Sequence, residues 1–173
     1  MIAETGHYAL ILALGVAIVQ TVLPLLGARL RDPQLAAVAA PAAQMQFLLI
    51  AISFIALTTA YVTSDFSVEN VWRNSHSAKP LLYKISGVWG NHEGSMVLWV
   101  LILSIFGAAV ALFGNSLPLE LKSRALAVQG SIGLAFLLFI ILTSNPFIRL
   151  DPPPIEGNGL NPILQDPALA LKV

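Results

Sequence analysis

Three residues whose side chains can take part in chemistry lie within five positions of one another, at Trp89, His92 and Glu93. They fall in a polar, glycine-punctuated stretch directly before an apolar run that begins near Ser95. A neutral imidazole is a common metal ligand, and aromatic rings stack on flat ligands. The cluster therefore predicts a surface that contacts a flat aromatic cofactor or a partner protein. A second interpretation stays open, because Trp also serves as an anchor at membrane–water interfaces.

The other residues of metal-ligand type do not extend this cluster into a metal site. His7 and His76 are distant from His92 in the sequence, and no two histidines are four residues apart, as they are in helical metal motifs. One His and one Glu are too few to hold a metal ion, so we predict none. The chain has no cysteine, which excludes disulfides, thiolate metal sites and thiol redox chemistry by this chain alone.

The composition indicates an integral membrane protein. Hydrophobic residues make up 57% of the 173 residues, charged residues make up 10%, and the mean hydropathy is +0.80. Soluble domains contain roughly 25% charged residues. So few charges cannot solvate a globule of this size, and the apolar residues fall in long blocks. The formal net charge is zero, so no basic field is present and we expect no nucleic-acid partner.

Four apolar blocks are long enough to cross a membrane. At about 1.5 Å per residue, a helix of about 20 residues spans a hydrocarbon core of about 30 Å. We therefore predict an all-α, polytopic integral membrane protein with about four transmembrane helices, a long periplasmic loop and a Pro-rich tail. The four-helix region covers residues 1–144, with spans at about 8–26, 44–62, 95–113 and 125–143 and the long loop at 63–94.

The interior of these spans carries no Asp, Glu, Lys, Arg or His. Proton relays and ion pathways place ionisable groups inside the membrane. The sequence therefore argues against a channel or a proton-conducting subunit.

Loop charge predicts the orientation. The two short loops, at 27–41 and 114–124, carry four basic residues, and the longer segments on the other side carry five. The positive-inside rule gives most weight to short loops near helix ends. We therefore expect the short loops to be cytoplasmic. The N-terminus, the loop 63–94 and the tail are then periplasmic.

The tail, residues 145–173, is rich in proline without periodicity, which is typical of extended, irregular structure. Asp166 followed by Pro167 suits the N-cap and first position of a helix, six residues before the end of the sequence. We expect this to be the incomplete start of a next helix. Isolated helices shorter than about 12 residues are marginal in water. The tail from about Pro152 onward is therefore expected to be mobile unless a second polypeptide packs on it.

Two strings of the sequence are specific enough to indicate a family. One is Trp-Gly-Asn-His-Glu-Gly-Ser at 89–95, followed by Leu-Trp-Val-Leu at 98–101, and the other is Asn-Pro-Ile-Leu-Gln-Asp-Pro at 161–167. With further matches at 139–147 and 154–157, they resemble the CcmF family of cytochrome c-type biogenesis proteins. This family is the haem lyase subunit of bacterial and plant-mitochondrial maturation systems. The resemblance runs over essentially the whole chain but covers only the N-terminal part of the much longer family.

The resemblance implies a role in cytochrome c maturation. The intact family attaches haem covalently to cysteine thiols of apocytochrome c on the periplasmic side of the inner (cytoplasmic) membrane. The implied cofactor is haem. The implied partners are apocytochrome c, the haem chaperone, the thiol-reducing subunits of the system and a separate chain that holds the remaining helices. Trp89, His92 and Glu93 are then expected on the outer face, near the path of haem or apocytochrome.

The chain also departs from the family pattern. The family's Trp-rich WWD segment and the histidines for its membrane-embedded haem have no counterpart here. A periplasmic His of the family follows the Gln of Gln-Asp-Pro by seven residues, where this chain has Lys172. We therefore expect a split subunit, a truncation or a frameshifted product that does not bind haem on its own, and whether it is an enzyme stays open. The alternative is a non-catalytic structural or interaction subunit of the membrane, or an inactive truncated fragment.

Overall fold

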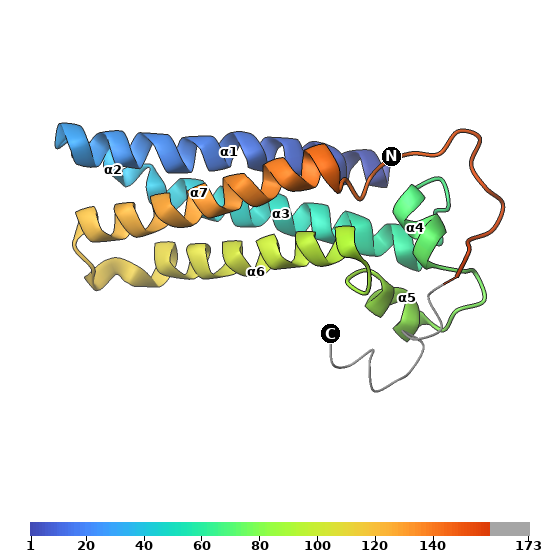
Figure 1. The fold of residues 1–173 in the computed structure, drawn as a ribbon. Helices are drawn as coiled ribbons and strands as arrows, with labels where there is room; N and C mark the ends of the chain where they lie inside the picture. Colours follow the sequence, from blue (N-terminus) through green and yellow to red (C-terminus); the bar gives the residue numbers. More distant parts are fainter. Residues whose placement is uncertain (160–173) are drawn as a thin grey trace.

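The computed structural model describes residues 1–159, and most of them are helical (Figure 1). The sequence Asp-Pro-Gln at 32–34 shows how local residues set the start of a helix. The Asp32 carboxylate accepts from the backbone N–H of Gln34 as the N-cap, and Pro33 takes the first helical position. The elements are α1 (Ile2–Leu30), α2 (Pro33–Ala37), α3 (Ala39–Val62), α4 (Glu69–Asn74), α5 (Leu81–Gly87), α6 (His92–Phe113), the 3-10 turn η1 (Gly114–Ser116) and α7 (Leu119–Thr143).

Four of these helices, α1, α3, α6 and α7, are 22 to 29 residues long. By length and composition, each is able to cross a membrane. Figure 1 shows them side by side as an elongated bundle, with the short helices α4 and α5 at one end. The prediction of an all-α protein with about four membrane helices is confirmed, and the protein is a multi-pass membrane protein.

Helix α1 packs through small residues. Gly6, Ala13 and Ala17 are buried and, with the buried Leu10, recur at spacings of three and four along one helix face. A Cβ added to Gly6 would lie 2.4 Å from the ring of Phe147. Membrane helices associate mainly through close packing, which small residues permit. The missing side chain at Gly6 therefore lets the segment that follows α7 fold against α1.

Two glutamines connect three helices inside the bundle. Gln20 of α1 is fully buried, and its Nε2 donates to the carbonyl of Leu126 at 2.9 Å and to Oε1 of Gln129 at 2.7 Å. Gln129 of α7 in turn donates through Nε2 to the carbonyl of Leu103 in α6, at 3.1 Å. Interhelical hydrogen bonds in a membrane contribute roughly 0.6 to 2 kcal/mol each. They fix the register of α7 against α1 and α6.

One end of the bundle is covered by residues 63–91 and 144–159, which we call the cap. The backbone N–H of Glu69 donates to Ile148 at 2.9 Å, and that of Leu150 donates to Ser67 at 2.8 Å. Arg149 also forms an ion pair with Glu4, so the start of α1 lies at the same end (Figure 1). The loop between α3 and α6 and the segment after α7 therefore form one joint structure.

The end of the described tail is hydrogen-bonded to the part of the cap that lies between α3 and α6. The backbone N–H groups of Asn158 and Gly159 donate to the carbonyls of Trp72 and Ser75, at 2.8 and 3.0 Å. These two residues are thus hydrogen-bonded to the end of α4, and the mobility expected of the tail from Pro152 onward stays a prediction. The helix predicted after Asp166 lies outside the described residues.

Candidate functional site

The start of α6 is fixed by Asn91. Its backbone is extended, and its side-chain Oδ1 accepts from the backbone N–H of Gly94 at 2.8 Å. Asn is a preferred N-cap because its side chain replaces one of the partners that the first N–H groups of a helix lack. The chain also turns tightly before α6, since a Cβ added to Gly94 would lie 1.6 Å from the carbonyl oxygen of Val88. Only glycine fits this approach.

Three side chains from different elements form a closed hydrogen-bonded ring above the start of α6. The fully buried Tyr61 of α3 donates through its hydroxyl to Oδ1 of Asn70 at 2.6 Å and accepts from Nδ2 of Asn91 at 2.9 Å. Asn70 of α4 donates through Nδ2 to Oδ1 of Asn91 at 2.9 Å. We call this the Tyr61–Asn70–Asn91 ring. It joins the end of α3, the cap helix α4 and the first turn of α6.

Glu93 is attached to this ring. Asn70 Nδ2 also donates to Glu93 Oε2 at 3.1 Å, and Glu93 is half-buried in the first turn of α6. A carboxylate is favourable at this position because the N-terminus of a helix carries partial positive charge. The ring and the helix dipole therefore both hold Glu93 in place.

His92 contacts a different element. Its side chain is exposed, its Nε2 lies 3.2 Å from Oγ of Ser144, and its ring meets that of Phe139 edge-on at a centroid distance of 6.2 Å. These contacts place the imidazole beside the end of α7. His92 thus faces α7, whereas Glu93 binds the ring on α3 and α4.

Trp89 has a third environment. It is half-buried and packs against the apolar core that contains Val88 and Val97. The indole therefore anchors the turn between α5 and α6, and part of its surface stays accessible. The structure keeps the three predicted residues at the same end of the bundle, but their contacts run to the core, to α7 and to the ring.

The donor set fits a surface that contacts haem better than one that encloses it. Among residues 1–159, no three His, Cys, Asp or Glu side chains come together as metal ligands. His92 can offer one imidazole from an exposed position, and Trp89 can offer part of an aromatic face.

The Tyr61–Asn70–Asn91 ring was missed by sequence reasoning. Asn91 could have been predicted as an N-cap, because it immediately precedes a long apolar helix. The other two had no such signal, since Tyr61 lies within an apolar span and Asn70 within a mixed loop.

Comparison with known proteins shows which proteins the chain resembles in sequence. The family described as "Cytochrome C assembly protein" matches residues 89–173. The chain is 63% identical over 171 residues to "Cytochrome c-type biogenesis protein CycK" of Bradyrhizobium diazoefficiens, with 99% of this chain and 26% of that protein covered. It is 44% identical over 170 residues to "Cytochrome c-type biogenesis protein CcmF" of Escherichia coli, with 98% of this chain and 26% of that protein covered.

A solved structure gives the same result for the fold. "Cytochrome c Heme Lyase CcmF" superposes with a TM-score of 0.80 at 27% identity, over 85% of this chain and 25% of that one. The chain therefore spans about a quarter of the length of the relatives it matches. In sequence and in fold, it is a CcmF-like chain of the cytochrome c-type biogenesis proteins, as its two specific strings indicated.

Proposed function

We propose that this chain forms part of a membrane haem lyase and helps to attach haem covalently to apocytochrome c on the periplasmic side. The observation that carries the proposal is the match of the whole cap and bundle to proteins named for cytochrome c biogenesis, at up to 65% identity. The chain spans about a quarter of the length of these relatives.

In this proposal, haem and apocytochrome c contact the protein at the cap and the adjoining first turn of α6. The Tyr61–Asn70–Asn91 ring fixes the first turn of α6, and Trp89 and His92 on either side of Asn91 keep accessible surface at the same end. Haem is the substrate, and Trp89 can stack on it while His92 approaches its iron or a polar group of the partner. Glu93 holds its position beside the ring. The chain has no cysteine, so apocytochrome c supplies the thiols.

The location follows from the same proposal. We place the protein in the inner membrane with the cap on the periplasmic side, because the short loops at the other end of the bundle carry basic residues near helix ends. The partners are apocytochrome c, a haem chaperone, thiol-reducing subunits and a polypeptide with the remaining helices.

A chimera tests this function. The part of the Bradyrhizobium diazoefficiens relative that matches this chain is replaced by the matching 171 residues of this chain, and the chimera is expressed in a strain that lacks its own CcmF-type protein. Haem-stained gels then measure covalently bound haem in the c-type cytochromes. We expect holo-cytochrome c to be restored. A chimera that accumulates in the membrane at the normal level but yields no holo-cytochrome c would favour the alternative of a non-catalytic structural subunit.

A further inference from the structure

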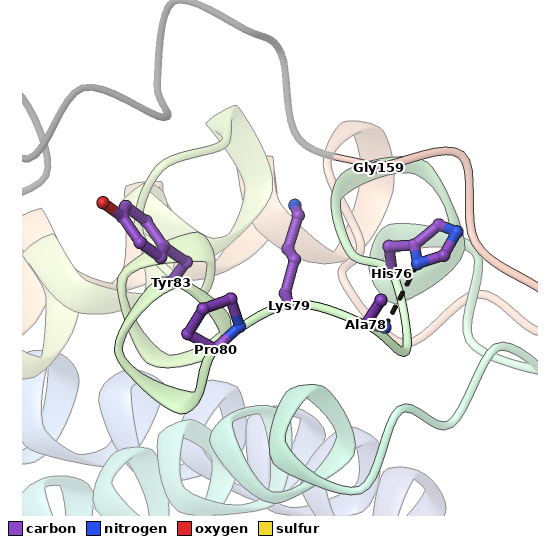
Figure 2. Close-up of a pocket in the computed structure, with 6 residues that line it drawn as sticks. All are labelled: His76, Ala78, Lys79, Pro80, Tyr83 and Gly159. Carbon is purple, nitrogen blue, oxygen red and sulfur yellow. Dashed lines mark hydrogen bonds between the residues drawn. The ribbon is translucent and has the colours of Figure 1, made fainter.

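A pocket of about 450 Å³ lies in the cap, away from the ring (Figure 2). It is formed where the chain leaves α4 and enters α5. Within residues 1–159, it is lined by His76, Ala78, Lys79, Pro80, Tyr83 and Gly159. Trp89, His92 and Glu93 are not among them. The pocket is therefore a second feature of the cap, separate from the candidate site.

Lys79 supplies a positive charge to this pocket. Figure 2 shows it rising between Tyr83 and His76, on the same side of the loop. Its Nζ donates to the carbonyl of Asn74 at 3.0 Å, and no carboxylate within residues 1–159 forms an ion pair with it. Burial lowers the pKa of the Lys79 ammonium to about 8. An ammonium has three donors, so two remain for an anion.

The carboxylate of Glu156, which approaches His76, already accepts hydrogen bonds from other groups. Glu156 accepts from the backbone N–H and the hydroxyl of Ser77, at 3.0 and 2.6 Å, and from the N–H of Gly157 at 3.0 Å. Its closest approach to His76 is 3.8 Å, whereas Nδ1 of His76 accepts from the N–H of Ala78 at 3.2 Å (Figure 2). Glu156 thus accepts from Ser77 and Gly157 and forms no ion pair with Lys79.

Two exposed leucines follow the pocket in the sequence. Leu81 and Leu82 directly follow the lining residue Pro80, and 58% and 62% of their surfaces are exposed. They begin α5, which lies beside the end of the bundle where α3 stops and α6 starts (Figure 1). In a membrane protein this is the level of the lipid headgroups, where leucine side chains can enter the acyl region and lysine reaches phosphates.

We propose that this pocket binds the phosphate of an anionic phospholipid, with Lys79 and the Tyr83 hydroxyl as donors and with Leu81 and Leu82 against the acyl chains. The lipid supplies an anion for the Lys79 ammonium, which forms no ion pair within the described residues, and apolar chains for the exposed Leu81 and Leu82. The site would hold α5 at the membrane surface and is independent of the proposed haem chemistry.

Lipid binding to the purified chain tests the site. The protein in detergent micelles is titrated with phosphatidylglycerol and, separately, with phosphatidylcholine, and bound lipid is counted by native mass spectrometry. One basic contact near a membrane surface corresponds to roughly fivefold in affinity. We expect one phosphatidylglycerol to bind more tightly than phosphatidylcholine. Lys79→Gln should lower the ratio of the two affinities about fivefold. Lys79→Arg should keep it.

Two controls make the test specific. Arg73→Gln removes a basic residue of the same cap that is already paired with Glu69, and it should bind phosphatidylglycerol like the unmodified chain. Leu81→Ser combined with Leu82→Ser should weaken the binding of phosphatidylglycerol but leave the competition by inorganic phosphate unchanged. An unchanged preference in Lys79→Gln overturns the proposal. Full displacement of the lipid by millimolar phosphate, with no effect of the leucine changes, overturns the assignment to a lipid in favour of free phosphate.

Discussion

Replacing Tyr61 with Phe should destabilise the cap through a single lost hydroxyl. This hydroxyl is fully buried and is the donor that Asn70 Oδ1 receives at 2.6 Å. Phe keeps the ring and its packing, so the change removes polar contacts without opening a cavity. The effect therefore reports on the Tyr61–Asn70–Asn91 ring and not on the apolar core around it.

The magnitude follows from what each partner loses. Asn91 Nδ2 keeps two other acceptors, the carbonyls of Gly87 at 2.7 Å and Val88 at 3.1 Å. Asn70 Oδ1 is left without this donor in a buried position. An unsatisfied buried acceptor costs about 1–3 kcal/mol, so we expect Tyr61→Phe to lower the free energy of unfolding by about 2 kcal/mol.

Asn91→Ala should cost a similar amount, since it also removes the N-cap of α6, which contributes about 1 kcal/mol. Because Tyr61 and Asn91 share one hydrogen bond, the double variant should be less destabilised than the sum of the two single changes, by about 1 kcal/mol.

The assay is reversible unfolding in mixed micelles with increasing SDS, followed by tryptophan fluorescence. Trp72 and Trp89 are half-buried against the core beside the ring and report on its opening. Tyr8→Phe is the matched control, because Tyr8 is 65% exposed and its loss should stay within about 0.5 kcal/mol. If Tyr61→Phe also stays within that limit and the coupling to Asn91 is zero, the ring does not hold the cap together.

Three further predictions use other parts of the structure. Gly94→Ala should cost about 1–3 kcal/mol or more in unfolding free energy, because its Cβ would collide with the Val88 carbonyl oxygen at 1.6 Å; full stability of the variant would show that the turn before α6 is looser. Hydrogen bonds from Ser77 lower the pKa of Glu156 from 4.5 to about 2, so its contribution to stability is complete above pH 4.5 and is lost as the pH falls towards 2. Thermal unfolding across this range should show a larger loss in the unmodified chain than in Glu156→Gln, in which Glu4, whose pKa is also lowered to about 2, still contributes. Cysteines at Ser77 and Ser116 should test orientation, with an impermeant maleimide labelling only the first in intact spheroplasts; the reverse pattern would contradict a periplasmic cap.

The long helices could be predicted because their signal is local. An uninterrupted apolar block identifies a membrane helix without knowledge of its neighbours. The helices are longer than the predicted membrane spans, since α1 already begins at Ile2 and α7 at Leu119, ahead of the expected spans at 8 and 125. Helix geometry continues into the polar flanks that hydropathy assigns to loops, because backbone hydrogen bonding does not depend on apolar side chains.

The cap could be predicted only in outline. Trp89, His92 and Glu93 were identified by residue type, but their partners come from elements that are distant in the sequence, such as Ser144 for His92 and Asn70 for Glu93. Which side of the α6 N-terminus each residue takes depends on how α4 and the segment after α7 fold over the bundle. No periodic pattern in the sequence encodes these loop-to-loop contacts.

The most direct test of the central claim is the yield of covalent haem when the half-buried Trp89 and the exposed His92 are changed in the chimera. Trp89→Ala together with His92→Gln removes the aromatic face and the imidazole, while Gln can still bond to Ser144. Lost stacking and an imidazole contact amount to roughly 1.4 kcal/mol or more, so we expect holo-cytochrome c to fall about tenfold at unchanged chimera abundance. The His7→Gln control at the same end should keep the normal yield. A double variant that matures cytochrome c as well as the unmodified chimera would contradict a role of this cap in haem attachment.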